Sequence, residues 1–238
     1  MSRIQNNRPD PSRDRILHAA IREFSEHGLA GARTGAIAAA ARVNKALLYY
    51  YFRDKEGLYA AALEEVAGKV AGDALAVLEL DCSPGERLLR FALQHFDRNF
   101  IHRGFGALMQ QEMVRFRTGK SNSMRILAKK AFEPMWGRSL QLVEEAIGTG
   151  ELFDVDPMQL MYAALGANVF YFLSAPMVRL LTNEDPLEPA AMAARRRSAI
   201  EYLGQTIFTD RRHGARLAKS VLAAMPFPET AIPEQKTA

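Results

Sequence analysis

The chain has 238 residues, of which 48% are hydrophobic and 24% are charged. This composition supplies enough apolar surface for one large domain or two small ones and argues against wholesale disorder. A single cysteine, Cys82, excludes an intramolecular disulfide framework and is typical of a reducing compartment. The polar segment MSRIQNNRPDPSRDR at the start has no apolar stretch of the secretory type, so we expect a cytoplasmic protein.

The net charge is +4, and the excess positive charge lies in the first quarter of the chain. Residues 1–60 hold ten Lys or Arg and six Asp or Glu, whereas the two signs balance over the remaining residues. A nucleic-acid-binding head on a neutral body is expected to show this distribution. On charge alone, a chance surplus on a solvated face remains the alternative.

Helical periodicity dominates the whole chain, and neither an alternating apolar pattern nor an Asn-Gly or Asp-Gly hairpin turn predicts a sheet. The fold class that we expect is therefore all-α. Apolar residues at intervals of about four predict an amphipathic helix from about Ser12 to Gly28, where glycine provides a left-handed stop. Three more helices follow, each opened by a residue type that caps N-termini, namely Thr34, Asn44 and Asp54. They are predicted to cover residues 34–41, 45–51 and 55–80.

Three later helices share one start signal, a capping residue followed by proline and, two residues further on, by Glu or Gln. The three starts are SPGE from Ser83, DPMQ from Asp156 and DPLE from Asp185. They predict helices over residues 84–102, 157–182 and 187–208.

Two further helices are expected near residues 104–117 and 122–147, which brings the total to about nine. Pro134 and Pro176 lie inside predicted helices and predict kinks there. After Asp210 the basic segment predicts one more short helix. The proline-rich residues 226–238 are typical of a disordered tail.

Residues 160–178 carry no charge over 19 positions, which is long enough to span a membrane. No basic cluster flanks this segment, and Asn168 and Pro176 interrupt it. A helix buried in a core or in a dimer interface has the same composition, and we favour that interpretation.

A helix, the tight link Arg42-Val43 and a short second helix form the pattern of a helix-turn-helix, whose second helix enters the major groove of DNA. The four alanines before Arg42 allow the first helix to pack closely. Asn44, Lys45, Ala46 and Leu47 form the end that would face the bases. Lys45 can reach a phosphate or a guanine edge, whereas Ala46 and Leu47 offer only apolar contact.

The segment from Arg15 to Tyr59 resembles the DNA-binding domain of the TetR family of bacterial repressors. The string Leu48-Tyr49-Tyr50-Tyr51-Phe52, followed by Lys55-Glu56, carries the resemblance most specifically. Arg42 stands where the family usually has glycine, which predicts a left-handed residue at a cost of about 1 kcal/mol. Ala46, Leu47 and Tyr51 also depart from the usual pattern, so base preference does not transfer.

The resemblance implies roles for single residues in the head. Thr34, Lys45, Tyr49, Tyr51 and Lys55 match positions that contact phosphates or position the recognition helix, and Ala46 and Leu47 match positions that face bases. Leu48 and Phe52 match core positions, and packing in the core is the alternative for each tyrosine. Three tyrosines in a row cannot all face one core, because successive residues lie about 100° apart. The predicted DNA-contacting residues are Thr34, Asn44, Lys45, Ala46, Leu47, Tyr49, Tyr51 and Lys55.

Three arginines, Arg3, Arg8 and Arg13, precede or begin the first helix. Such an arm can lie in the minor groove of DNA, and a solubilising tail is the alternative.

For the rest of the chain, the resemblance implies a domain that binds a small molecule and forms a homodimer through its last two helices, here near 157–182 and 187–208. The dimer would read a palindromic operator in double-stranded DNA. Flexible apolar and polar side chains are candidates for the effector pocket, and core filling is the alternative for each. These candidates are His95, Asn99, Phe105, Met109, Met113, Trp136, Asn168 and Tyr171.

No motif for catalysis, for a phosphate loop or for metal binding occurs, so we expect neither an enzyme nor a cofactor or metal site. The predicted organisation is a DNA-binding domain over residues 1–56, a regulatory and dimerisation domain over 57–225 and the tail over 226–238. The predicted function is a transcriptional repressor released from its operator by a small-molecule effector. The alternative is a helical ligand-binding or membrane-associated protein whose basic head binds acidic surfaces.

Overall fold

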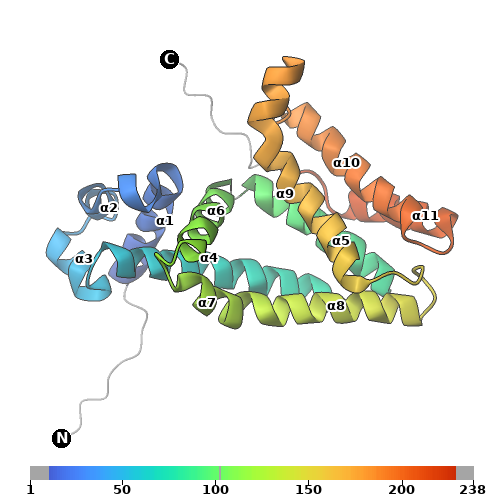
Figure 1. Cartoon of the computed structure of the whole chain (residues 1–238), viewed down its shortest axis with the longest axis horizontal. Coiled ribbons are helices and arrows are strands. Elements are labelled where there is room, and N and C mark those ends of the chain that lie inside the picture. The colour runs from blue at the N-terminus through green and yellow to red at the C-terminus, as the bar shows by residue number, and fades with distance from the viewer. Residues whose placement is uncertain (1–10, 102, 229–238) are drawn as a thin grey trace, which may run out of the picture. The chain divides into compact units, whose positions relative to one another are not determined.

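The structure is a computed structural model that describes residues 11–101 and 103–228. Within these ranges it contains eleven α-helices and one π-helical segment (Figure 1), and the one extended pairing is an isolated bridge between Leu152 and Phe208. The all-α prediction is therefore confirmed. Arg3, Arg8 and the part of the predicted tail after residue 228 lie outside the described residues.

The helix bounds follow the capping and proline signals closely. Asn44 accepts a hydrogen bond from the backbone N of Leu47 (2.8 Å), and Asp156 accepts one from Gln159 (3.0 Å), as predicted for N-caps. The helices are α1 Pro11–Gly31, α2 Thr34–Ala40, α3 Lys45–Phe52, α4 Lys55–Leu78, α5 Pro84–Ile101, α6 Arg103–Arg117, α7 Ser123–Leu127, α8 Glu133–Gly148, α9 Pro157–Thr182, α10 Pro189–Thr206 and α11 Arg211–Ala224, with the π-helix η1 over Ala128–Phe132.

The start predicted for α2 at Thr34 is confirmed, whereas the cap predicted for α2 and the start predicted for α10 are wrong. Arg33, and not Thr34, is the N-cap of α2, because the Thr34 hydroxyl lies against the hydroxyl of Tyr49 instead. The helix predicted from residue 187 begins at Pro189, because the Asp185 carboxylate accepts the backbone N–H of Leu187 in a preceding turn (2.9 Å). Proline at the first helical position then sets the backbone angle of α10.

The helix predicted over 122–147 is divided into α7, η1 and α8. Pro134 lacks a backbone N–H, and its ring would meet the carbonyl of Lys130 in a regular α-helix. The chain widens to a π-helix over Ala128–Phe132, immediately before α8, and this irregularity accommodates the proline.

The chain folds into two compact units. The first consists of residues up to Lys69 together with Gly104–Ala131, and the second consists of Val70–Arg103 together with the residues from Phe132 on. The boundary predicted between residues 56 and 57 stays a prediction.

The core of the first unit is formed by the apolar faces of α1, α2, α3 and the beginning of α4. Phe24 is fully buried, and its ring meets that of Tyr59 edge-on at 5.1 Å. Gly28 ends the regular part of α1 with φ 62°, as its sequence position predicts. The side chains that hold α3 to this core are Leu48 and Phe52.

In the second unit, α5 lies among α8, α9, α10 and α11 (Figure 1). No residue of α5 before Ile101 is exposed, which fits this central position. Asp97 of α5 and Arg196 of α10 form a buried bidentate ion pair with N–O distances of 2.6 and 2.8 Å. Burial raises the pKa of Asp97, and the Arg196 guanidinium opposes this shift. The ion pair therefore fixes α10 against the central helix.

Helix α9 is long and apolar enough to cross a membrane by length and composition, and only 17% of its most apolar window is buried within the chain. Its large exposed side chains include Phe170, Leu173 and Met177. The prediction that this helix is buried in a core is thus not met within one chain, and the alternative of a dimer interface stays a prediction.

Candidate nucleic-acid interface

The turn between α2 and α3 has the geometry that the short link predicts. The backbone N of Val43 donates to the carbonyl of Ala38 (3.0 Å), and Arg42 adopts φ 54°. A left-handed arginine is uncommon, because its Cβ approaches the backbone more closely than a glycine would. This turn sets the angle at which α3 leaves α2.

The first residues of α3 present an exposed surface. Asn44, Lys45 and Ala46 are exposed and Leu47 is half-buried, whereas Leu48 turns into the core. The carboxamide oxygen of Asn44 is occupied by the Leu47 N–H, so its cap fixes the helix start. The exposed side chains of Lys45 and Ala46 therefore remain available to contact the major groove of DNA.

The N-terminus of α2 and the middle of α3 are joined by a direct side-chain contact. The hydroxyl groups of Thr34 and Tyr49 lie 3.1 Å apart, within hydrogen-bonding distance. The side chain of Lys45 passes beside Gly35. A Cβ added to Gly35 would lie 3.1 Å from the Cε of Lys45. Three residues predicted to contact DNA, namely Thr34, Lys45 and Tyr49, are therefore brought together on one surface.

The remaining tyrosines differ in exposure. Tyr50 is 79% exposed and Tyr49 is 41% exposed, whereas Tyr51 is half-buried and its ring lies 5.3 Å from that of Tyr50. The resemblance to the family assigns no role to Tyr50. The helical period, however, predicts which side of α3 this residue occupies. At 100° per residue, Tyr50 lies about 200° from both Leu48 and Phe52, on the side opposite to the core.

The start of α4 contributes a second cationic group. The Asp54 carboxylate caps this helix by accepting the backbone N–H of Gly57 (2.7 Å). The Lys55 ammonium donates to the carbonyl of Ala30 (3.3 Å), which connects α4 to the end of α1. Since an ammonium has three donors, Lys55 retains the capacity to meet a phosphate while it holds this contact.

Arg13 is the one predicted arm residue within the described part of the chain. Its guanidinium lies 5.4 Å from the centre of the Phe52 ring and 4.0 Å from the Asp14 carboxylate. The alternatives of a minor-groove contact and a solubilising role both stay open.

Among the residues predicted to form an effector pocket, three polar ones gather between α5 and α9 in the second unit. Asn168 donates to the carbonyl of Ala92 (3.1 Å) and lies 3.5 Å from Nδ1 of His95. Asn99 donates to the carbonyl of His95 (2.7 Å). Burial, with a smaller contribution from Arg98, lowers the pKa of His95 to about 3, so its imidazole is neutral at physiological pH.

The other pocket candidates are distributed over both units. Tyr171 donates to the carbonyl of Pro186, and the ring of Trp136 on α8 lies 5.9 Å from that of Tyr162 on α9, tilted at 53°. Phe105, Met109 and Met113 lie on α6, in the first unit, where Met109 is buried and Met113 is exposed. The assignment of these eight residues to an effector pocket stays a prediction.

Helix α6 also bonds to the N-terminal part of α4 within the first unit. Arg115 donates to the carboxylate of Glu56 (3.1 Å), the residue that follows Lys55. The neighbouring Glu112 is fully buried, and burial raises the pKa of the adjacent Tyr59 to about 12. A displacement of α6 would therefore act on the start of α4.

Comparison with known proteins agrees with this surface. Residues 16–62 match the family model described as bacterial regulatory proteins, tetR family. The HTH-type transcriptional repressor SCO4008 of Streptomyces coelicolor is 49% identical over 57 residues, which cover 24% of this chain and 30% of that protein. The repressor NicS of Pseudomonas putida is 31% identical over 131 residues, which cover 54% of this chain and 61% of NicS. The chain thus matches less than two thirds of the length of either relative.

Among solved structures, a transcriptional regulator from Saccharomonospora viridis in complex with choline aligns with a TM-score of 0.66. It is 20% identical in sequence, and the alignment covers 83% of this chain and 97% of the regulator. At this identity the likeness concerns the fold, which extends over the helices of both units.

Proposed function

Because the chain belongs to the TetR family of bacterial regulators, we propose that it is a cytoplasmic transcriptional repressor that binds a palindromic operator as a homodimer. The exposed start of α3 carries this proposal. Asn44 fixes the helix end, and Lys45 and Ala46 stand free to meet base edges or phosphates. Thr34 and Lys55 are the first residues of α2 and α4, and Tyr49 lies against Thr34. Phosphate contacts at such positions orient a recognition helix.

A stripe of exposed apolar residues on α9 supports the homodimer. Its residues recur at intervals of three and four, so they share one helix face. Monomeric proteins rarely expose a continuous apolar surface of this length, and a second copy related by a two-fold axis would cover it. The stripe consists of Tyr162, Val169, Phe170, Leu173, Met177, Leu180 and Leu181, and Tyr202 of α10 is exposed as well.

We propose that a small-molecule effector binds in the second unit and releases the repressor from its operator. The neutral polar group of His95, Asn99 and Asn168, beside the rings of Phe96 and Tyr171, could orient such a ligand. Glu56 and Arg115 connect α6 to the start of α4, so a shift of α6 would move the head that carries Lys55. A change in the spacing of two heads would then break the match to two half-sites.

The membrane-associated alternative receives no support from the comparisons, because the relatives reported above are regulators or repressors. Its strongest feature is the apolar surface of α9, which the homodimer accounts for equally well.

Gel-shift assays with palindromic DNA from the region upstream of the gene test the proposal. We expect a sequence-dependent complex whose binding constant falls steeply with salt, because phosphate contacts release counterions. A scrambled duplex of the same length and composition is the control. Equal binding to both duplexes at moderate salt would rule out operator recognition.

The variants Tyr49→Phe and Lys55→Ala should weaken binding to operator and to scrambled DNA alike, by about 3–30-fold, since phosphate contacts carry no sequence information. Tyr49→Phe removes only the hydroxyl that meets Thr34. Arg197→Ala, which removes an exposed charge from α10, serves as the matched control. Thermal melting must be unchanged, because unfolding of the Lys55 variant would assign that residue to the Ala30 contact alone.

A further inference from the structure

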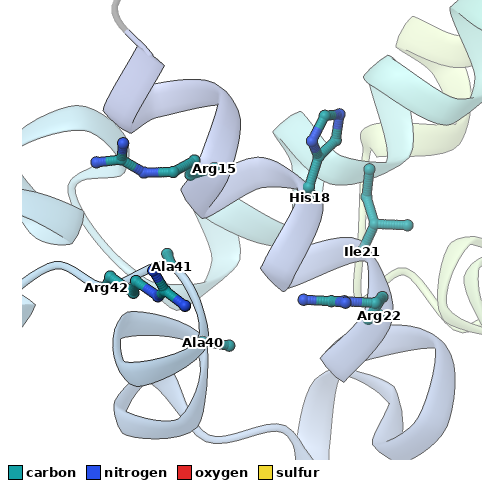
Figure 2. Close-up of a pocket in the computed structure, with 7 residues that line it drawn as sticks. All are labelled: Arg15, His18, Ile21, Arg22, Ala40, Ala41 and Arg42. Carbon is teal, nitrogen blue, oxygen red and sulfur yellow. The ribbon is translucent and has the colours of Figure 1, made fainter.

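A basic cavity lies in the first unit between α1 and the C-terminal end of α2. Its volume is about 560 Å³, which falls within the range of small-molecule sites. Figure 2 shows its lining side chains coming from α1, from the end of α2 and from the turn that follows α2. The lining residues are Arg15, His18, Ile21, Arg22, Ala40, Ala41 and Arg42.

The cavity lining contains three guanidinium groups and no carboxylate. Arg15, His18 and Arg22 are spaced by three and four residues and therefore share one face of α1. In the view of Figure 2, the side chains of Arg22 and Arg42 point toward one another across the opening. Neither of these two arginines forms an ion pair with another described residue, so their like charges are left without compensation by the part of the chain that the structure describes.

Arg42 adds an independent observation. Its backbone is left-handed, with φ 54°, at a turn position that glycine would occupy without steric cost. The strain of about 1 kcal/mol is tolerated at a residue whose side chain is exposed and lines the cavity. An anion held by the guanidinium would offset this cost in the bound state.

The cavity borders the predicted operator surface within the same unit, since Arg42 precedes Asn44 by two residues. Thr34 and Gly35, at the N-terminal end of α2, meet Tyr49 and Lys45 of the recognition helix. The cavity lies at the other end of α2, about 10 Å away along a helix of seven residues. A ligand at this site would therefore lie away from the contact between Thr34 and Tyr49.

We propose that this cavity binds the phosphate group of a phosphorylated ligand. Arginine forks match phosphate oxygens in bidentate geometry, and Arg22 and Arg42 in a lining without carboxylates could form such a clamp. Ile21, Ala40 and Ala41 provide an apolar wall for the remainder of a small molecule. The proposal rests on the fold of the first unit and does not depend on operator binding or on the effector.

Thermal unfolding in inorganic pyrophosphate tests the clamp. At matched ionic strength in chloride, saturating pyrophosphate should raise the Tm of the wild-type protein by about 2–4 °C. Arg22→Ala and Arg42→Gly should each lose most of this rise, and Arg197→Ala should retain it. Glycine fits the left-handed turn, so Arg42→Gly preserves the fold while it removes the guanidinium. An absent rise, or an equal rise in all four proteins, would overturn the proposal.

Binding to a random-sequence duplex as a function of KCl distinguishes a free phosphate from a phosphate of the DNA backbone. If the site takes a free phosphorylated ligand, both variants should keep the wild-type salt dependence while losing the response to pyrophosphate. If it takes a backbone phosphate, each variant should reduce the slope of log K against log salt by about 0.9, and pyrophosphate should compete with the duplex. In both cases the site binds a phosphate group, and unchanged behaviour in both assays would exclude it.

Discussion

The aromatic residues from Tyr49 to Phe52 divide by helical angle and do not form one patch. Phe52 is buried with Leu48, Tyr49 is engaged by Thr34, and Tyr50 stands on the opposite side, exposed to 79%. The sequence-based prediction that the tyrosines cannot all face the core is confirmed. The partner of Tyr49 depends on how α2 crosses α3, which a helical period alone does not reveal.

At the scale of single residues, the buried His95 should make the stability of the protein depend on pH. Because the pKa of His95 is lowered to about 3, the unfolded chain binds a proton below about pH 6.5 while the folded chain does not. The free energy of unfolding should therefore decrease as the pH falls from 6.5 toward 3. We expect the stability advantage of the wild type over His95→Gln to shrink by about 2 kcal/mol between pH 7 and pH 5.

Urea unfolding of both proteins at the two pH values measures this difference. The comparison cancels the titration of other groups, which both proteins share. A gap that stays constant with pH would mean that His95 is accessible to protons in the folded state.

At the scale of elements, helix packing depends on where small residues lie. Helices α10 and α11 approach closely at Gly204 and Gly214, since a Cβ on Gly204 would lie 2.6 Å from the carbonyl oxygen of Gly214. The apolar spacing along these two helices does not predict this contact. Glycine in a helix normally costs stability, and here it permits backbone contact between two helices.

Gly204→Ala should destabilise the protein by about 1–3 kcal/mol, because the methyl group meets a backbone oxygen that cannot give way. Gly137→Ala is the matched control on α8, where a Cβ would meet nothing within 4 Å. This control should be stabilising by about 0.5–1 kcal/mol, because alanine is the better helix former. Chemical denaturation measures both, and equal effects of the two variants would contradict the close approach of α10 and α11.

At the scale of the whole molecule, the apolar stripe of α9 is the largest feature that one chain leaves unexplained. The sequence predicted a helix that is buried on most sides, yet Leu173 and Met177 are more than half exposed. A homodimer would resolve this difference, and it would supply the two heads that a palindrome requires.

The variant Leu173→Glu should convert the proposed dimer to a monomer and weaken operator binding by at least tenfold, because a charge in the middle of an apolar interface loses its water without gaining a partner. Leu80→Glu, at an exposed position after α4, is the control and should stay dimeric. Sedimentation equilibrium measures the molecular mass of each protein. A wild-type protein that sediments as a monomer at micromolar concentration would refute the dimer, and a dimeric Leu173 variant would place the interface elsewhere.

Local signals in the sequence determined the helices, because caps, prolines and apolar spacing act within a few residues. Asn44, Asp54 and Asp156 therefore gave correct helix starts and caps. Thr34 gave the correct start of α2 but does not cap it, and Asp185 caps a turn that precedes α10. The string around Tyr49 to Phe52 was specific enough to indicate the family and its DNA-binding head.

Only the tertiary structure decided which distant side chains meet. Thr34 with Tyr49 and Asp97 with Arg196 are separated by 15 or more residues along the chain, and Arg22 and Arg42 line one cavity from different elements. These arrangements depend on the crossing angles between helices. The close approach of α10 and α11 at Gly204 likewise results from packing. Spacing along one helix predicts which face a residue occupies, and the arrangement of the helices decides what that face meets.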